Sequence, residues 1–118
     1  MLKEAMLAMR VTDMEYAPEI CGYLKAAYED LRIAGVIIDG VCNFAISEDA
    51  QTGAITVTDN SSIRNELVKT AMITYAKIHF GEPTNREALE KSYDLQRKQL
   101  ANATGYTDFT GTEGAEAP

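Results

Sequence analysis

The stretch VKTAMITYAKIHFGEP (residues 68–83) decides the fold, because a broad apolar stripe is followed at once by two stop signals. Apolar side chains recur here at intervals of three and four residues, which is the period of an amphipathic helix. Gly81 can take the left-handed conformation that closes a helix, and Pro83 prevents continuation. The sequence therefore predicts a central helix packed between neighbours. The stripe comprises Ile63, Leu67, Ala71 and Ile78, and is widened by Val68, Met72 and Tyr75.

Two further long helices are predicted around the central one. The first begins at Pro18, which suits the first helical position because a proline has no N–H to leave unpaired there. A capping box at Thr12 and Glu15 offers an earlier start, but it would place Pro18 inside the helix. This helix is expected to end at Gly35. Its apolar repeat consists of Ile20, Leu24, Ala27, Leu31 and Ala34.

The remaining helix boundaries follow from capping residues. The cluster DNSS (59–62) favours helix N-termini, so the central helix is expected to begin there. A second capping box at residues 84–87 opens the last helix, which is predicted to end at Gly105. Residues 2–9 form a short helix that must dock on another element, since so short a helix is marginal alone. Residues 10–12 look extended. The predicted face of the last helix is Leu89, Ser92, Tyr93, Gln96 and Leu100.

A β-hairpin is predicted between the first two long helices. Residues 41–47 (VCNFAIS) and 54–58 (AITVT) are rich in β-branched and apolar side chains, and a polar loop with a glycine separates them. Isolated hairpins are rarely stable, so this one should lie against the helices or pair with another chain. The predicted fold is mainly α: a small bundle of about three long helices plus a short N-terminal helix, with a hairpin. It spans residues 1–105, and residues 106–118 form a flexible acidic tail.

The length, charge and cysteine content of the chain limit the class of protein. The 118 residues fit one domain. A formal charge of −7, from 11 basic and 18 acidic residues, argues against a protein that grips nucleic acid. No apolar run approaches the ~20 residues of a membrane span and no signal core opens the chain, so we expect synthesis inside the cell. Cys21 and Cys42 lack CxxC spacing and are expected to be reduced.

Few residues offer catalytic or metal-binding chemistry. His79 is the only histidine, and no motif supplies it with a nucleophile or an orienting partner. One histidine and two isolated cysteines give no zinc spacing, and the glycines are too scattered for a phosphate loop. We therefore expect neither catalysis nor a metal or cofactor. Six tyrosines without a tryptophan leave phenol groups that need partners, which is typical of subunit interfaces. The residues alone indicate a helical interaction protein.

Three segments resemble the head–tail connector proteins of tailed bacteriophages, also called head-completion, adaptor or DNA-packaging proteins. They are LKAAYEDLRIAGV (24–36), VKTAMITYAKIHFGEP (68–83) and YDLQRKQLANATGYTDF (93–109). With the opening KEAMLAMRVT, they cover most of residues 2–109 in the order of the family. The chain departs from the family where residues 37–60 are longer and more strand-like, and where the surroundings of Pro18 are less acidic.

The resemblance implies a structural virion protein made in the cytoplasm of the host bacterium. Members of the family form rings, usually of twelve subunits, beneath the portal protein. The ring extends the DNA channel and links the head to a neck or tail-completion protein. DNA is expected to pass without sequence-specific binding, and an acidic or mixed surface suits such sliding better than a basic one. No membrane partner is expected.

Two sets of residues are the candidate contacts of such a subunit. The predicted tail is polar apart from two aromatic side chains. We therefore predict that the portal binds the tail segment Tyr106, Thr107, Asp108 and Phe109. Folding back of Tyr106 and Phe109 onto their own helices is the alternative. Contacts between subunits are predicted at Phe44, Ile46, Ile55, Val57 and Tyr75. Two other classes remain open: a small acidic regulatory protein, acting as a dimer or monomer, and an enzyme, which would need His79 in a pocket with a carboxylate.

Overall fold

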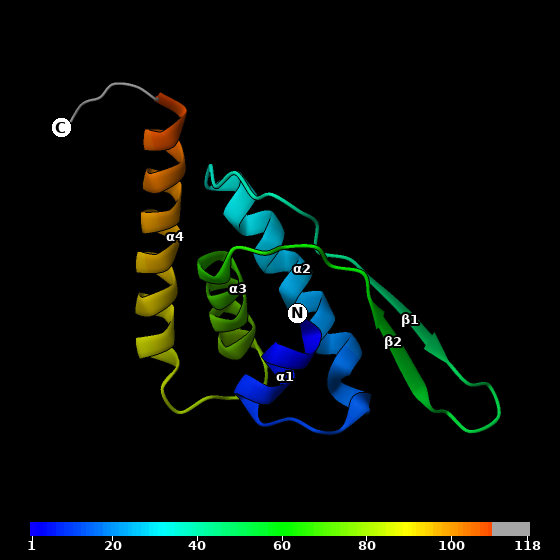
Figure 1. Cartoon of the computed structure of the whole chain (residues 1–118). Helices are drawn as coiled ribbons and strands as arrows, with labels where there is room; N and C mark the ends of the chain where they lie inside the picture. Colours follow the sequence, from blue (N-terminus) through cyan, green and yellow to red (C-terminus); the bar gives the residue numbers. More distant parts are fainter. Residues whose placement is uncertain (110–118) are drawn as a thin grey trace.

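Residues 1–109 fold into four helices and one antiparallel hairpin (Figure 1). This computed structural model describes residues 1–109, with side chains described through Ala103. The predicted class, mainly α with a hairpin between the first two long helices, is confirmed. In chain order the elements are α1 (Leu2–Met9), the 3₁₀ turn η1 (Met14–Tyr16), α2 (Ala17–Ile33), β1 (Phe44–Glu48), β2 (Ile55–Asp59), α3 (Glu66–His79) and α4 (Arg86–Phe109).

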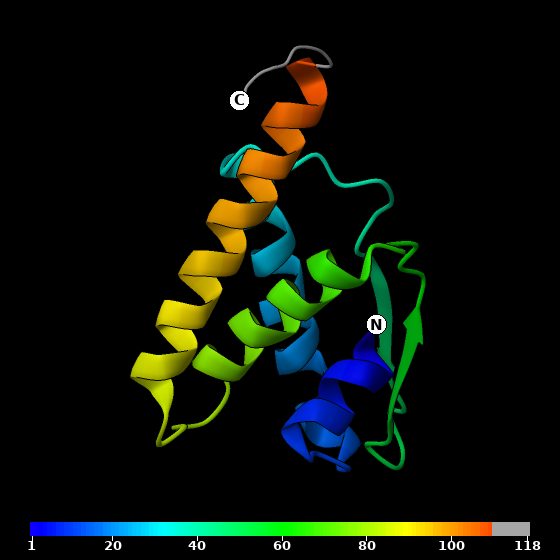
Figure 2. The same ribbon diagram turned by 60° about the vertical axis from the view of Figure 1, so that its left-hand side comes forward.

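Helices α2 and α3 pack together at the centre and hold most of the core. Helix α1 contacts both of them, and α4 packs on α3. The hairpin and α4 lie on opposite sides of this centre, as Figures 1 and 2 show. The largest fully buried side chains are Ile20, Cys21, Leu24, Leu31 and Met72.

Helix α2 follows its predicted limits closely. It begins one residue before Pro18, which lies in the first turn as expected. The preceding turn is capped by Asp13, whose side chain accepts a hydrogen bond from the Glu15 N–H at 2.9 Å. At the other end Gly35 has φ +100°, and the Val36 N–H bonds back to the Leu31 carbonyl at 3.0 Å. This arrangement satisfies carbonyls that the helix end would otherwise leave unpaired.

Helix α1 forms as predicted, but Arg10, the first residue after it, is not extended. Arg10 is left-handed, with φ +58°. The Arg10 N–H bonds to the Leu7 carbonyl at 3.1 Å, and the Val11 N–H bonds to the Met6 carbonyl at 2.9 Å. The prediction of an extended segment at residues 10–12 was therefore wrong at Arg10, because the chain closes the helix here by the same kind of turn as Gly35.

The predicted start of α3 at residues 59–62 was also wrong. The helix begins at Glu66, and the Asn65 side chain caps it by accepting the Leu67 N–H at 2.9 Å and the Val68 N–H at 3.2 Å. Ile63, assigned to the helical stripe, is buried but lies before the helix.

The serines of that cluster extend the hairpin instead. The Ser62 hydroxyl accepts a hydrogen bond from the Val41 N–H at 2.9 Å, and the Ser61 hydroxyl accepts one from the Asn43 N–H at 3.1 Å. Serine competes in this way for backbone groups outside helices, which is why it favours both caps and turns. The first strand therefore begins at Phe44, three residues later than predicted. The N–H groups of Val41 and Asn43, which were expected to lie in this strand, are bonded by serine side chains instead.

The last helix begins later and ends later than predicted. It opens at Arg86 and continues through Gly105 to Phe109. The expected stop at Gly105 was wrong, because an isolated glycine costs a helix only ~1 kcal/mol and does not end it. Four residues of the predicted tail are thus helical, and residues 110–118 lie outside the described part of the chain. On the predicted face Tyr93 is buried, whereas Ser92 is exposed.

Candidate functional site

A shallow polar hollow of about 310 Å³ lies between α2, α3 and α4 and contains His79. Carboxylates from Asp30, Glu90 and Asp94 line it as well. The His79 ring packs against aromatic side chains: its centroid lies 4.4 Å from that of Tyr75. Among the side chains described, those of residues 1–103, no hydrogen bond or ion pair joins the imidazole to a carboxylate. The hollow thus brings the required residue types together without the geometry of a catalytic pair.

Asp30, in the hollow, ties α2 to α4. Its Oδ2 accepts a hydrogen bond from the Tyr93 hydroxyl at 2.6 Å and another from Arg97 Nε at 3.0 Å. Burial and the neighbouring carboxylate both raise the pKa of Tyr93, so the phenol stays protonated and remains a donor. We interpret this cluster as structural, because the Asp30 carboxylate already accepts hydrogen bonds from both Tyr93 and Arg97.

The cysteines and carboxylates of the described chain form no reactive or metal-binding cluster. Cys21 and Cys42 are buried and unbridged, and burial raises the pKa of their thiols to about 12 and about 11. Such thiols remain protonated and are poor nucleophiles. Among residues 1–109 no three His, Cys, Asp or Glu side chains are grouped to hold a metal ion. None of the helices in this range is long and apolar enough to span a membrane.

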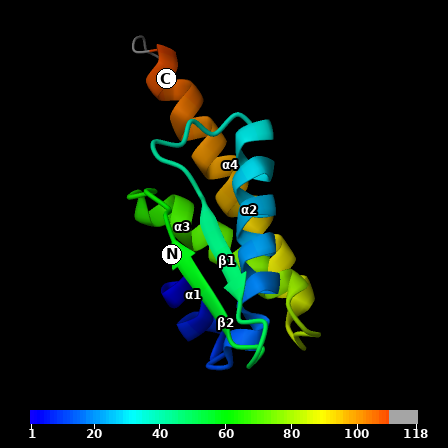
Figure 3. The same cartoon turned by 90° about the vertical axis from the view of Figure 1, so that its right-hand side faces the viewer.

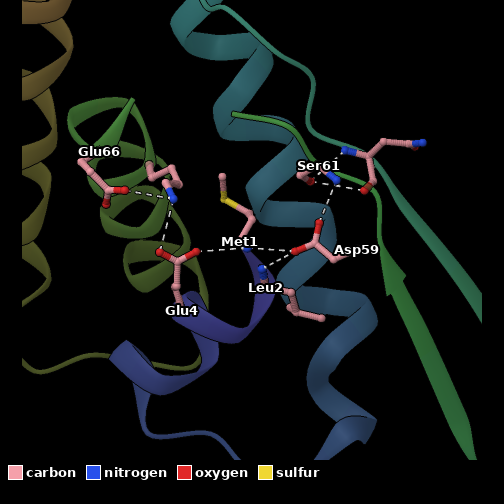
Figure 4. A network of polar contacts seen from close by, with 8 residues as sticks. Met1, Leu2, Glu4, Asp59, Ser61 and Glu66 are labelled. Atoms are coloured by element: carbon pink, nitrogen blue, oxygen red, sulfur yellow. Dashed lines mark hydrogen bonds and ion pairs between the residues drawn. The ribbon is translucent and has the colours of Figure 1, made fainter. Parts of the chain in front are cut away.

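A network of charged groups joins α1, the hairpin and α3 (Figure 4). The ammonium group of Met1 lies 2.9 Å from Asp59 Oδ2 and 3.1 Å from Glu4 Oε1. Lys69 extends the network, with Nζ 3.5 Å from Glu4 and 3.1 Å from Glu66. The same Asp59 oxygen accepts the Leu2 N–H at 2.9 Å. Asp59, at the end of β2, thus fixes where the hairpin leaves the helical body.

The two faces of the hairpin differ in character. The register pairs Ile46 with Val57 and Ala45 with Thr58, so side chains alternate between the faces. One face carries Phe44, Ile46, Ile55 and Val57, and the other carries Ala45, Ser47, Thr56 and Thr58. Phe44 and Val57 pack against the core, whereas Ile46 is 48% exposed. Figure 3 shows β2 on the side of α1 and β1 on the side of α2.

An apolar groove of about 480 Å³ runs between β2, α1 and η1, and we call it the α1–β2 groove. Sequence reasoning missed most of its lining. The one available signal was that Leu7 lies off the apolar stripe of α1, and this side chain is 77% exposed. The lining comprises Leu2, Lys3, Met6, Leu7, Val11, Thr12, Met14, Val57 and Asp59.

A second apolar groove, of about 260 Å³, lies between α3 and α4. Leu67 and Leu100 line it, and Leu67 is 68% exposed. The buried Oε1 of Gln96 has no hydrogen-bond partner within the described residues. Unpaired buried acceptors are uncommon in folded proteins. This groove therefore marks incomplete packing along α4.

The structure locates the residues predicted for subunit and portal contacts with mixed results. Tyr75 is half-buried and packs edge-to-face on Tyr93, with ring centroids 5.3 Å apart, so part of its surface serves the α3–α4 contact. Tyr106, Thr107, Asp108 and Phe109 fall on the last turns of α4, and their side chains lie outside the described part of the structure. The four hairpin residues predicted for subunit contacts share one face.

No family model, curated protein or solved structure that was compared matches this chain.

Proposed function

We propose that this protein is a head–tail connector subunit of a tailed bacteriophage, which forms a ring beneath the portal and extends the DNA channel. The proposal rests first on the three family-like segments, which contribute the second half of α2, most of α3 with its closing turn, and α4 through Phe109. The main departure from the family, residues 37–60, coincides with the hairpin and the loop leading to it. The resemblance therefore concerns the helical body.

The observation that carries the proposal is that one copy leaves large apolar side chains exposed on several separate parts of its surface. Leu7 is exposed on α1, Ile33 at the end of α2 and Leu67 on α3. A ring subunit needs such patches, because it contacts a neighbour on each side and further proteins above and below. The described residues offer no oriented catalytic pair that would favour an enzyme instead.

In this proposal the ring, of about twelve subunits, binds the portal on one side and a neck or tail-completion protein on the other. Residues 106–109 are the proposed portal contact, presented by a helix and not by a tail. The protein acts in the virion neck after synthesis in the bacterial cytoplasm. DNA slides through the channel without sequence-specific binding, in keeping with the net charge of −7.

The test is the mass of the purified protein in solution, alone and mixed with the portal protein of the same phage. A ring-sized species, or a monomer that joins the portal at one copy per portal subunit, is the expected result. A stable dimer that ignores the portal would instead support the regulatory alternative. Deleting residues 106–118 should abolish portal binding, and unchanged binding would refute the assignment of the contact.

A further inference from the structure

The free edges of the hairpin point to a specific contact between copies of this chain. The Asn60 N–H bonds to the Asn43 carbonyl at 2.9 Å, and the Asp49 N–H bonds to the Ala54 carbonyl at 2.8 Å. Antiparallel strands alternate between bonded and non-bonded pairs. In this register 45–58 and 47–56 are therefore the bonded pairs within the hairpin. The remaining residues direct their backbone N–H and C=O groups outward, along both edges.

The residues whose backbone groups point outward also carry the apolar side chains of the hairpin. Each edge is therefore suited to pairing with a further strand. On β1 the outward backbone groups belong to Phe44, Ile46 and Glu48, and on β2 to Ile55, Val57 and Asp59. An added strand continues the face of the strand it joins, since directly opposed residues point the same way. Exposed edges of this kind readily pair with another chain.

The α1–β2 groove extends the apolar surface beyond the β2 edge. Val57 lines the groove from the hairpin, and Leu7 and Met14 line it from α1 and η1. A strand added to β2 would therefore place its own inward side chains over these exposed residues. The occupant must be extended, apolar on one face and antiparallel to β2.

The β1 strand of a second copy meets each of these requirements. Within one copy β1 already runs antiparallel to β2, and its Ile46 stands opposite Val57. Charge favours the match as well: β1 and its turn carry the exposed Glu48 and Asp49, whereas α1 presents the exposed Lys3 at the groove. Neither Lys3 nor Glu48 takes part in an ion pair within residues 1–109.

We propose that the β1 edge of one copy adds to the β2 edge of the next, with Ile46 seated over Leu7 and Met14 in the α1–β2 groove. The contact is head-to-tail, because each copy donates one edge and accepts the other. Repetition of such a contact either closes into a ring or runs on as a filament. The inference rests on the proposed ring and specifies the surface through which its subunits join.

The decisive experiment mixes two variants that each carry one added cysteine, Leu7→Cys and Ile46→Cys, under oxidising conditions. Cys21 and Cys42 are buried, so the wild-type chain is a control without an exposed thiol. Because each variant carries one new thiol, a cross-link between them can form only between copies. The expected product is the Leu7–Ile46 heterodimer, in several-fold excess over either homodimer. A dominant Ile46–Ile46 product would show pairing of β1 with β1 about a two-fold axis and would overturn the proposal, as would the absence of any cross-link.

A second measurement compares Ile46→Lys with Ser47→Lys by sedimentation velocity. The two residues are neighbours on β1 but lie on opposite faces of the hairpin, and both are exposed. Lysine at residue 46 should weaken self-association at least about tenfold, since it would leave an unpaired charge in an apolar contact. Lysine at residue 47 should leave it unchanged, and equal effects of the two substitutions would contradict the contact.

The outcomes separate this inference from the proposed function. Rings that persist in Ile46→Lys and give no Leu7–Ile46 cross-link would refute the strand contact and leave the connector assignment standing. A wild-type chain that stays monomeric at every concentration, yet joins the portal one copy per subunit, would do the same. A portal-indifferent dimer linked through Ile46 would refute both.

Discussion

Replacing Asp59 with asparagine tests whether the N-terminal network anchors the hairpin. Burial alone would raise the pKa of this carboxyl, but the Leu2 N–H, the Met1 ammonium and the Ser61 N–H outweigh it and lower the pKa from 3.8 to about 2. One pKa unit corresponds to about 1.4 kcal/mol, so this depression is equivalent to about 2.4 kcal/mol. The side chain is 26% exposed, and solvent screening reduces the expected contribution to roughly 1–2 kcal/mol.

The pH dependence follows from the direction of each pKa change. Asp59 has a depressed pKa in the folded state. Its contribution to the free energy of unfolding is therefore complete above pH 3.8 and is lost as the pH falls towards about 2. For the Met1 amine, burial alone would lower the pKa, but Asp59 and Glu4 outweigh it and raise the pKa above 8.0. Its contribution is therefore complete below pH 8.0 and is lost as the pH rises through the folded value. The pair should stabilise the fold most between these limits.

The assay is urea unfolding followed by far-ultraviolet circular dichroism, at about pH 7 and again at about pH 2. Asp59→Asn should lower the free energy of unfolding by roughly 1–2 kcal/mol at the higher pH and by much less at the lower pH. Asp39→Asn is the matched control, because Asp39 is exposed and makes no ion pair within the described residues. An equal loss at both pH values, or none at the higher, would refute the reasoning.

Three further substitutions test the packing of α4, of the loop before β1 and of α2. Tyr93→Phe removes the 2.6 Å hydrogen bond to Asp30 from a side chain that is only 8% exposed, and should cost about 1.5–3 kcal/mol in thermal or urea unfolding. A loss below about 0.5 kcal/mol would show that Arg97 alone satisfies Asp30. Gly40→Ala would bring a Cβ to 2.6 Å from the Ser62 carbonyl oxygen at φ +111°, and should destabilise by more than about 1 kcal/mol. Gly22→Ala, with nothing within 4 Å, should stabilise α2 by about 0.5–1 kcal/mol, and the opposite order of the two alanine variants would contradict these assignments.

Periodicity predicted the parts of the fold that local forces determine. Apolar spacing located α2 and α3, and Gly35 and Gly81 end or follow them with φ +100° and +67° as their positions suggested. The β-branched and apolar content of residues 41–47 and 54–58 predicted the hairpin, whose strands form at Phe44–Glu48 and Ile55–Asp59. These features depend on contacts between residues near one another in sequence.

Prediction was poorest where a residue suits two local structures and a contact with residues distant in the sequence decides between them. Ser61 and Ser62 are good helix caps, but the backbone of residues 41–43 competes for their hydroxyls. Gly105 is a plausible helix end, yet it lies inside helix α4. The α1–β2 groove was missed for a related reason. It combines side chains from α1, η1 and β2, whose approach depends on an ion pair between Met1 and Asp59 that no local pattern encodes.

Helix α4 differs from the other long helices in how little it buries. Among residues 86–103 only Tyr93 is buried, and its main contact is with one neighbour, α3. A helix that buries so few side chains can open while the rest of the protein stays folded, at a free energy below that of global unfolding. Its amide protons should then exchange with solvent earlier than those in the cores of α2 and α3. The three N-terminal helices and the hairpin would form one cooperative unit, from which α4 detaches at the turn containing Gly81.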